Sequence, residues 1–205
     1  MQKRIGKYLL QKKLGAGASA TVYLALDEFS GRAVALKLYE AEKSADITSF
    51  ARSQFLTEAA LVGRLCHPHI AMILDACSDD TVTYVVMEFV AGGSLSQFTG
   101  VGDLLPVSEV VEIGFKCSGA LDYAFRHDVI HRDIKAANIL RAADTQVKIS
   151  DFGVALIRNA AHTLIMDAGS PYYASPEQAT GVELSHHSDM FSLGVVLYEL
   201  LTAKR

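Results

Sequence analysis

The sequence has no excess of basic residues and no cysteine framework, and each absence argues against a class of protein. Its 205 residues include 19 lysines and arginines against 23 acids, a net charge of −4. Nucleic-acid binding needs a basic face, so the charge gives no reason to expect a nucleic-acid partner. The three cysteines, Cys66, Cys77 and Cys117, are far apart and form no Cys-x-x-Cys pair. This odd, scattered set predicts reduced thiols in a reducing compartment, not a disulfide framework.

The sequence also lacks the apolar segments that target or anchor a chain. The basic start, residues 1–6, has no apolar stretch behind it and does not resemble a signal peptide. No apolar run approaches the roughly 18 residues of a membrane span, so we expect a cytoplasmic chain without a membrane segment. With 50% hydrophobic and 20% charged residues, the composition is that of a globular protein with a real core.

The first ninety residues predict a small antiparallel sheet with one helix. Short β-rich or apolar runs occur at residues 8–10, 21–25, 33–38, 70–74 and 83–90. A glycine-containing stretch, residues 15–20, separates the first two runs, and Ser78-Asp79-Asp80 is turn chemistry between the last two. Residues 49–65 carry a helical period whose apolar face holds Phe55, Leu61, Val62 and Leu65. His67-Pro68 is expected to end this helix.

The character of the sequence changes at Ala91-Gly92-Gly93-Ser94, where we place a boundary between an N-terminal lobe, residues 1–90, and a C-terminal lobe, residues 91–205. Pro106 suits the first turn of a helix, and apolar residues at helical spacing follow it up to His127. Residues 190–201 are apolar on nearly every side, and a helix of that kind is normally buried all round. The expected fold class is α+β.

The chemistry is centred on residues 131–138, a polar stretch directly after an apolar pair. Asp133 can accept the proton of an attacking hydroxyl, a contribution on the order of 10²–10⁴-fold in rate. Lys135 can balance charge on a transferred phosphoryl group. Asn138 and Asp151, thirteen positions later, supply the oxygen ligands that Mg²⁺ takes. A solvated loop would explain any one of these residues, but it is a poor explanation for all four at these spacings.

Two features of the N-terminal part serve the same chemistry. Gly15 and Gly17 precede Val22, and glycines let a backbone approach a phosphate, although a tight hairpin also needs them. Lys37 ends an apolar strand, where a snorkelling lysine is the commoner explanation. Glu58, however, falls on the core-facing side of its predicted helix, where a carboxylate needs a cation. We therefore expect a Lys37–Glu58 ion pair that directs the ammonium group to a nucleotide's phosphates.

Together these motifs resemble the eukaryotic-type (Hanks-type) protein kinases, in their serine/threonine branch. The resemblance runs from about Tyr8 to the last residue. It is carried by residues 15–22, Val34-Ala35-Leu36-Lys37, Glu58, residues 131–138, Asp151-Phe152-Gly153, Ser175-Pro176-Glu177 and residues 189–194. Lys135 is typical of the serine/threonine branch, and the sequence of residues 173–178 is similar to that of bacterial members of the family.

The resemblance implies a two-lobed kinase fold that uses ATP and Mg²⁺ to phosphorylate serine or threonine hydroxyls of proteins. It implies that adenine bonds to the backbone around Glu88 and Val90, with Met87 guarding the back of the pocket. It also implies apolar contacts to adenine from Leu14, Val22, Ala35 and Leu140.

The likeness has departures that affect regulation. Ala20 replaces a glycine in the phosphate loop, a position that tolerates small residues. Many relatives carry a phosphothreonine where this sequence has Met166, and Arg132 would normally bind that phosphate. Either Thr163 is then the autophosphorylation site, or Asp167 supplies a constant charge.

The family continues beyond residues 188–201 with further helices, one of which supplies an arginine for Glu177. We therefore expect that the C-terminal part of the catalytic domain is missing, and that the last helix exposes an apolar face and leaves the isolated chain marginally stable. Either the gene product is truncated, or the chain is a fragment of a longer protein; a membrane-anchored protein with a cytoplasmic kinase domain is one such protein. Two other functions stay open: a kinase-fold binding protein without turnover, and a small-molecule phosphotransferase. Lys135 and the loop at Glu177 favour a protein substrate.

Overall fold

The chain folds as two compact units, each of which is described by itself. The structure, a computed structural model, describes residues 3–17, 20–39, 49–142, 146–152, 171–182 and 184–204. The first unit comprises Met1–Arg64 and Met72–Phe89, and the second comprises Leu65–Ala71 and Val90–Arg205. Within the described ranges, no helix is long and apolar enough to cross a membrane.

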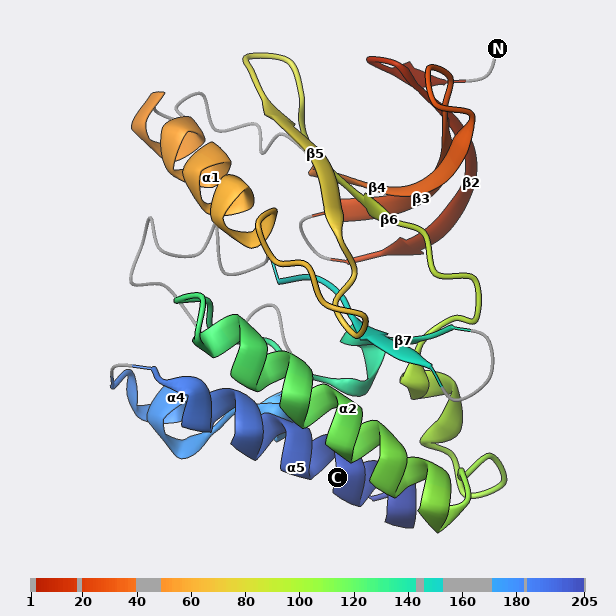
Figure 1. Cartoon of the computed structure of the whole chain (residues 1–205), viewed down its shortest axis with the longest axis vertical. Helices are drawn as coiled ribbons and strands as arrows, with labels where there is room; N and C mark the ends of the chain where they lie inside the picture. The colour runs from red at the N-terminus through yellow and green to blue at the C-terminus, as the bar shows by residue number, and fades with distance from the viewer. Residues whose placement is uncertain are drawn as a thin grey trace. The chain divides into compact units, whose positions relative to one another are not determined.

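The first unit is a six-stranded antiparallel sheet with one helix (Figure 1). The strands, in the spatial order β1-β2-β3-β4-β6-β5, are β1 Arg4–Ile5, β2 Tyr8–Ala16, β3 Ala20–Asp27, β4 Arg32–Tyr39, β6 Thr83–Glu88 and β5 Ile73–Ser78. Helix α1, Ser49–Val62, packs against β5. Figure 1 shows β2, β3 and β4 as one curved layer. The predicted antiparallel arrangement is therefore confirmed.

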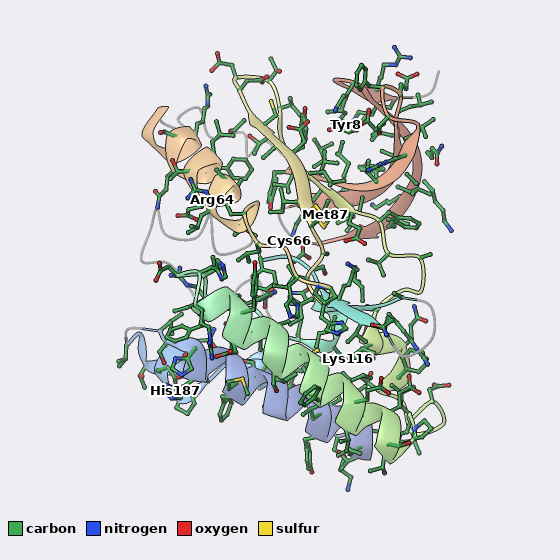
Figure 2. The ribbon with its side chains drawn as sticks, in the orientation of Figure 1. Tyr8, Arg64, Cys66, Met87, Lys116 and His187 are labelled. Carbon is green, nitrogen blue, oxygen red and sulfur yellow. The ribbon has the colours of Figure 1, made fainter. Side chains whose placement is uncertain are left out.

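Strand register sorts the side chains of this sheet onto two faces. Residues opposite each other in an antiparallel pair share a face, and neighbours along a strand alternate. Leu36 of β4 lies opposite Tyr23 of β3 and Val86 of β6, and this face carries a hydrophobic core. That core is made of Ile5, Tyr8, Leu10, Ala25, Val34, Leu36, Tyr84 and Val86; Tyr8 is labelled in Figure 2. Ala35 and Lys37, the neighbours of Leu36 along β4, therefore face the opposite side of the sheet.

Two predicted element boundaries in this part of the chain are wrong. Helix α1 ends at Val62, before His67-Pro68, and Leu61 is 38% exposed instead of sharing the buried face. Strand β5 begins at Ile73, whereas the apolar run was expected to form a strand from Ile70. The reason is tertiary: Ile70 is buried and bridges Ile149 of the second unit, so that part of the run follows a different partner.

The predicted turn at Ser78-Asp79-Asp80 is confirmed. The Asp79 carboxylate accepts hydrogen bonds from the N–H groups of Thr81 (2.7 Å) and Val82 (2.9 Å). The Thr81 hydroxyl also donates to it, at 2.7 Å. These donors, with the hydroxyl and amide of Thr81 foremost, hold the pKa of Asp79 below its usual value because they stabilise the charged carboxylate. Asp79 therefore joins β5 to β6 through backbone groups that a strand end would otherwise leave unpaired.

The second unit is mainly helical, with one short two-stranded sheet. Its elements are η1 Leu95–Phe98, α2 Val107–Phe125, η2 Ala136–Asn138, β7 Ile139–Arg141, β8 Val147–Ile149, η3 Pro171–Tyr173, α4 Pro176–Thr180 and α5 His186–Thr202. Helices α2 and α5 pack side by side (Figure 1). Gly114 of α2 permits this approach, because a Cβ there would lie 3.1 Å from Leu197 Cδ1 of α5.

The segment Leu65–Ala71 is held to the second unit by backbone hydrogen bonds. Ala71 N–H donates to Ile149 O (2.8 Å), and Ile149 N–H donates to His69 O (2.9 Å). The N–H of Cys66 donates to the Tyr123 hydroxyl of α2 at 3.2 Å. These bonds explain why a segment between α1 and β5 belongs to the second unit.

The glycine pair at the predicted lobe boundary is required by close packing on β7. Arg141 N–H donates to Gly93 O (2.8 Å), and a Cβ on Gly92 would lie 2.1 Å from Arg141 O. Gly93 also has φ +76°, in the left-handed region that favours glycine. Residues 92 and 93 therefore begin the part of the chain that packs on this small sheet.

The buried side of helix α5 carries polar as well as apolar residues, and its exposed side carries several large apolar ones. Its fully buried residues include Ser188, Asp189, Ser192 and Glu199. Met190, Phe191, Tyr198 and Leu201 are between 41% and 51% exposed. The prediction that this helix exposes apolar side chains is confirmed. Its buried polar residues include Asp189, which holds the loop at residues 131–132.

Candidate active site

In the first unit, the register of the sheet gathers candidate nucleotide-binding residues on one face. Gly15 of β2 lies opposite Val22 of β3, and Val22 lies opposite Lys37 of β4. Ala35, two residues before Lys37, lies opposite Met87 of β6, which is labelled in Figure 2. Residues two positions apart on a strand share a face, and so do residues paired across two strands. These five residues therefore lie on one side of the sheet. Ala35 and Met87 are buried, whereas Lys37 is half-buried.

Helix α1 covers the same face at Lys37. Tyr39, two residues after Lys37, packs edge-on against Phe55 of α1 with ring centroids 5.8 Å apart. The Lys37 ammonium lies 5.8 Å from the Tyr39 ring centroid. Glu58 follows Phe55 by three residues and shares its helix face; it is half-buried and accepts a hydrogen bond from Gln54 Nε2 at 3.1 Å. The expected Lys37–Glu58 ion pair stays a prediction, and this packing favours it.

In the second unit, three side chains converge at residues 133–138. Lys135 Nζ lies 2.7 Å from Asp133 Oδ2, and these side chains are only 21% and 15% exposed. Asn138 Nδ2 donates both to the Asp133 backbone oxygen (2.8 Å) and to Asp133 Oδ2 (3.1 Å). Since both partners are acceptors, Nδ2 must be the atom that faces Asp133, which turns the Asn138 carbonyl oxygen away from it. Asp133 is thus oriented by a cation and an amide.

The backbone of this loop is held by a carboxylate from helix α5. Asp189 Oδ2 accepts the N–H of His131 (2.7 Å), and Asp189 Oδ1 accepts the N–H of Arg132 (2.8 Å). Burial raises the pKa of Asp189, while the N–H groups of His131 and Arg132 and the charge of Arg132 oppose that rise. Arg132 has φ +68°, a costly conformation for a residue other than glycine, and the bond to Asp189 helps to keep it there.

His131 joins the loop to the segment that carries Asp151. Its Nδ1 accepts the N–H of Asp133 at 3.2 Å, so Nε2 carries the proton and donates to Ser150 O at 2.9 Å. Ser150 N–H in turn donates to Asn138 O (2.8 Å). These bonds bring Asp151, with φ +65°, next to a residue bonded to Asn138.

Asn138 and Asp151 have the chemistry of a magnesium site that relies on the nucleotide. An amide oxygen and a carboxylate are hard ligands, and Mg²⁺ is usually held by one or two protein groups together with phosphate oxygens and water. In the described part of the chain, no cluster of three or more His, Cys, Asp or Glu side chains could hold a metal alone. An amide oxygen and one carboxylate fit a Mg²⁺ ion that phosphate oxygens and water also bind.

The remaining predicted residues lie in both units. Leu14 is 44% exposed at an irregularity in the β2–β3 pairing, and Gly17 N–H donates to Ala20 O at 2.8 Å. Glu88 N–H, at the end of β6, donates to Met72 O at 2.9 Å. Val90 and Leu140 belong to the second unit, and both are half-buried. Gly153, Thr163, Met166, Asp167, Gly169 and Ser170 lie outside the described residues.

A family model described as "Protein kinase domain" matches residues 8–205. The chain belongs to the protein kinase family. A probable serine/threonine-protein kinase from Clostridium acetobutylicum is 33% identical over 200 residues, covering 97% of this chain and 30% of that protein. Serine/threonine-protein kinase PrkC from Bacillus subtilis is 37% identical over 206 residues, covering 98% of this chain and 31% of PrkC. The chain thus spans about a third of the length of these curated relatives.

Solved protein kinases also resemble the chain in structure. The kinase domain of PknI from Mycobacterium tuberculosis has a TM-score of 0.79 at 28% identity, covering 98% of this chain and 77% of that one. The predicted kinase fold of class α+β and the similarity to bacterial serine/threonine kinases are therefore confirmed.

Two residues that shape the kinase site were not among the predicted site residues. Asp189 was noted only within a family motif, although a lone carboxylate in the first turn of an otherwise apolar helix is a signal of a buried anchor. Gln178 follows Ser175 by three residues, the spacing of a capping box, and the structure has that box at the start of α4. Its second contact, with Arg132, has no signal in the sequence because the two residues are far apart in the chain.

Proposed function

We propose that this chain transfers the γ-phosphate of ATP to serine or threonine hydroxyls of proteins. The observation that carries the proposal is that Lys135 and Asn138 both lie within hydrogen-bond distance of the Asp133 carboxylate. The names of the relatives as serine/threonine kinases support the choice of reaction. Two of the proposed catalytic groups, Lys37 and Glu58, belong to the first unit.

Asp133 acts as the acceptor of the substrate hydroxyl's proton. Its Oδ2 is the atom contacted by Lys135 and Asn138, so the carboxylate is oriented before substrate binds. The ammonium of Lys135 then lies where charge builds on the transferred phosphoryl group. Such positioning accounts for most of the catalysis in phosphoryl transfer, because little covalent chemistry is left to the protein.

ATP is bound through its phosphates and its adenine. Gly15, Gly17 and Lys37 bind its phosphates, the backbone at Glu88 and Val90 binds adenine, and apolar contacts come from Leu14, Val22, Ala35, Met87 and Leu140. Asn138 and Asp151 would hold Mg²⁺, which neutralises the phosphate charge when it is bound. The shared sheet face of Val22, Ala35, Lys37 and Met87 supports this assignment, since it offers an apolar surface next to one cation.

Arg132 receives an anionic group when the kinase is switched on. Its Nε is buried and has no hydrogen-bond partner within the part of the chain that the structure describes. A buried guanidinium donor favours a phosphate or carboxylate as its partner. We propose phosphorylated Thr163, formed by autophosphorylation, or the carboxylate of Asp167 as that group.

The test is incorporation of labelled γ-phosphate from Mg²⁺-ATP into a generic protein substrate and into the chain itself. Asp133→Asn keeps the shape of the side chain and removes the base, so incorporation should fall by at least about 10²-fold. Phosphoamino-acid analysis should then show phosphoserine or phosphothreonine. Thr180→Ala, which removes one exposed hydroxyl from α4, is the control and should retain wild-type transfer.

The outcomes separate this function from its two rivals. Mg²⁺-ATP binding without transfer to any protein would show a kinase-fold binding protein. Phosphate on a sugar or an aminoglycoside, and on no protein, would show a small-molecule phosphotransferase. Equal transfer by the wild type and Asp133→Asn would contradict the role of Asp133.

A further inference from the structure

Gln178 contacts two different parts of the second unit with the two ends of one amide group. Its Oε1 accepts the N–H of Ser175 at 2.9 Å, while Ser175 Oγ accepts the N–H of Gln178 at 3.3 Å. This exchange is the capping box that begins helix α4. Its Nε2 donates to the carbonyl oxygen of Arg132 at 2.8 Å, across 46 positions of sequence.

The orientation of this amide is determined by its partners. The Ser175 N–H can only donate, and the Arg132 carbonyl can only accept. A flipped amide would set two donors against each other at one end and two acceptors at the other. Gln178 therefore makes both contacts in a single orientation. A side chain that offers only a donor or only an acceptor could make just one of them.

The carbonyl that Gln178 holds belongs to the peptide unit that carries Asp133. The N–H of the same peptide unit donates to His131 Nδ1 at 3.2 Å. The peptide between Arg132 and Asp133 is thus held at its oxygen by α4 and at its nitrogen by His131. Holding it matters because Arg132, with φ +68°, is in a conformation that costs free energy and that an unrestrained loop would leave.

We propose that Gln178 is a positioning residue for Asp133, and that it makes the orientation of this base depend on a formed α4. The inference rests on the proposed kinase function and adds a residue to it. When α4 is formed, the bond from Nε2 keeps the Arg132–Asp133 peptide in place and the Asp133 carboxylate at the distances described. When α4 is lost, that restraint is lost with it. Small misplacements of a catalytic group can cost up to about 10²-fold in rate.

Three substitutions separate this role from a purely structural role in α4. Gln178→Glu keeps an acceptor for Ser175 N–H but places an oxygen against the Arg132 carbonyl. Gln178→Lys keeps a donor for that carbonyl but cannot accept from Ser175. Gln178→Met makes neither bond. Thr180→Ala is the matched control, since the Thr180 hydroxyl bonds within the same helix, to Pro176 O and Glu177 O.

The expected order of kcat differs from the expected order of melting temperature, both measured on the full chain. For kcat, Gln178→Lys should stay within about five-fold of wild type, whereas Gln178→Glu and Gln178→Met should fall by about 10–100-fold with little change in KM for ATP. For melting temperature, Gln178→Glu should be the most stable of the three because it keeps the cap. A kcat order that follows the melting temperatures, or kcat within two-fold of wild type in all three variants, would overturn the proposal.

Amide hydrogen exchange supplies a readout that does not depend on activity. Peptides covering residues 131–138 should exchange faster in Gln178→Glu and Gln178→Met than in the wild type, and Thr180→Ala should match the wild type. If the wild type transfers no phosphate, the proposed function fails, and hydrogen exchange alone then tests the contact between Gln178 and the Arg132 carbonyl. Exchange rates unchanged in Gln178→Glu and Gln178→Met would refute that contact's role. If the wild type is active and the Gln178 variants are unaffected, only the positioning role fails.

Discussion

Replacement of Asp189 should both destabilise the second unit and disable the site. Asp189→Ala removes the acceptors of the His131 and Arg132 N–H groups, which lie at 2.7 and 2.8 Å. A hydrogen bond to a charged group contributes about 1.5–3 kcal/mol, so two of them amount to about 3–6 kcal/mol. Burying the carboxylate has a desolvation cost that offsets part of this gain, so we expect a net loss near the lower end, at about 3 kcal/mol.

Thermal and chemical unfolding measure this loss. For a chain of this length, a destabilisation of about 3 kcal/mol lowers the melting temperature by about 6–12 °C. Because Arg132 is no longer held at its positive φ, kcat should also fall by more than about ten-fold. Asp122→Asn is the control: Asp122 pairs with Arg126 on the exposed side of α2, and an exposed pair contributes at most about 1 kcal/mol. A melting temperature for Asp189→Ala equal to that of Asp122→Asn would refute the anchoring role.

Two further predictions concern packing and pH. Gly114→Val should destabilise the chain by about 1–3 kcal/mol, because the new side chain meets Leu197 across the α2–α5 contact. Gly119→Ala on the same helix is the control: its methyl group has open space, so it should stabilise the chain by about 0.4–1 kcal/mol. Equal unfolding free energies for the two variants would contradict this packing. Asp79 has its pKa lowered in the folded state, so its contribution to stability is present above the unfolded value of about 3.9 and is lost as the pH falls through the folded value. The difference in unfolding free energy between wild type and Asp79→Ala should therefore shrink below about pH 4, and a difference that grows in acid would show the opposite sign.

The parts of this protein that the sequence predicts well are those whose partners are close in the chain. Asp133, Lys135 and Asn138 lie within six residues, and the structure has Lys135 and Asn138 in contact with Asp133. The turn at Asp79 is equally local. Asp189, in contrast, contacts the loop across 58 positions, and no local pattern states which backbone groups a distant carboxylate will meet.

Two element boundaries were predicted wrongly because they too depend on partners that are distant in the chain. The apolar run at residues 70–74 predicts one strand, but Ile70 pairs with Ile149 of the second unit while the strand proper begins at Ile73. Periodicity shows that residues are buried, but it does not show against what. Leu61 is the converse case: it follows the helical period and is still 38% exposed.

The central proposal is that Lys37 and Asp151 act on the same nucleotide, and a double-mutant cycle tests it most directly. Lys37→Ala, Asp151→Asn and the double variant are compared in kcat/KM for Mg²⁺-ATP-dependent phosphorylation. Groups that act as one unit give strongly non-additive effects, so the double variant should be within about three-fold of the worse single variant. Losses that multiply would mean that Lys37 and Asp151 act independently, and they would contradict a shared ATP site.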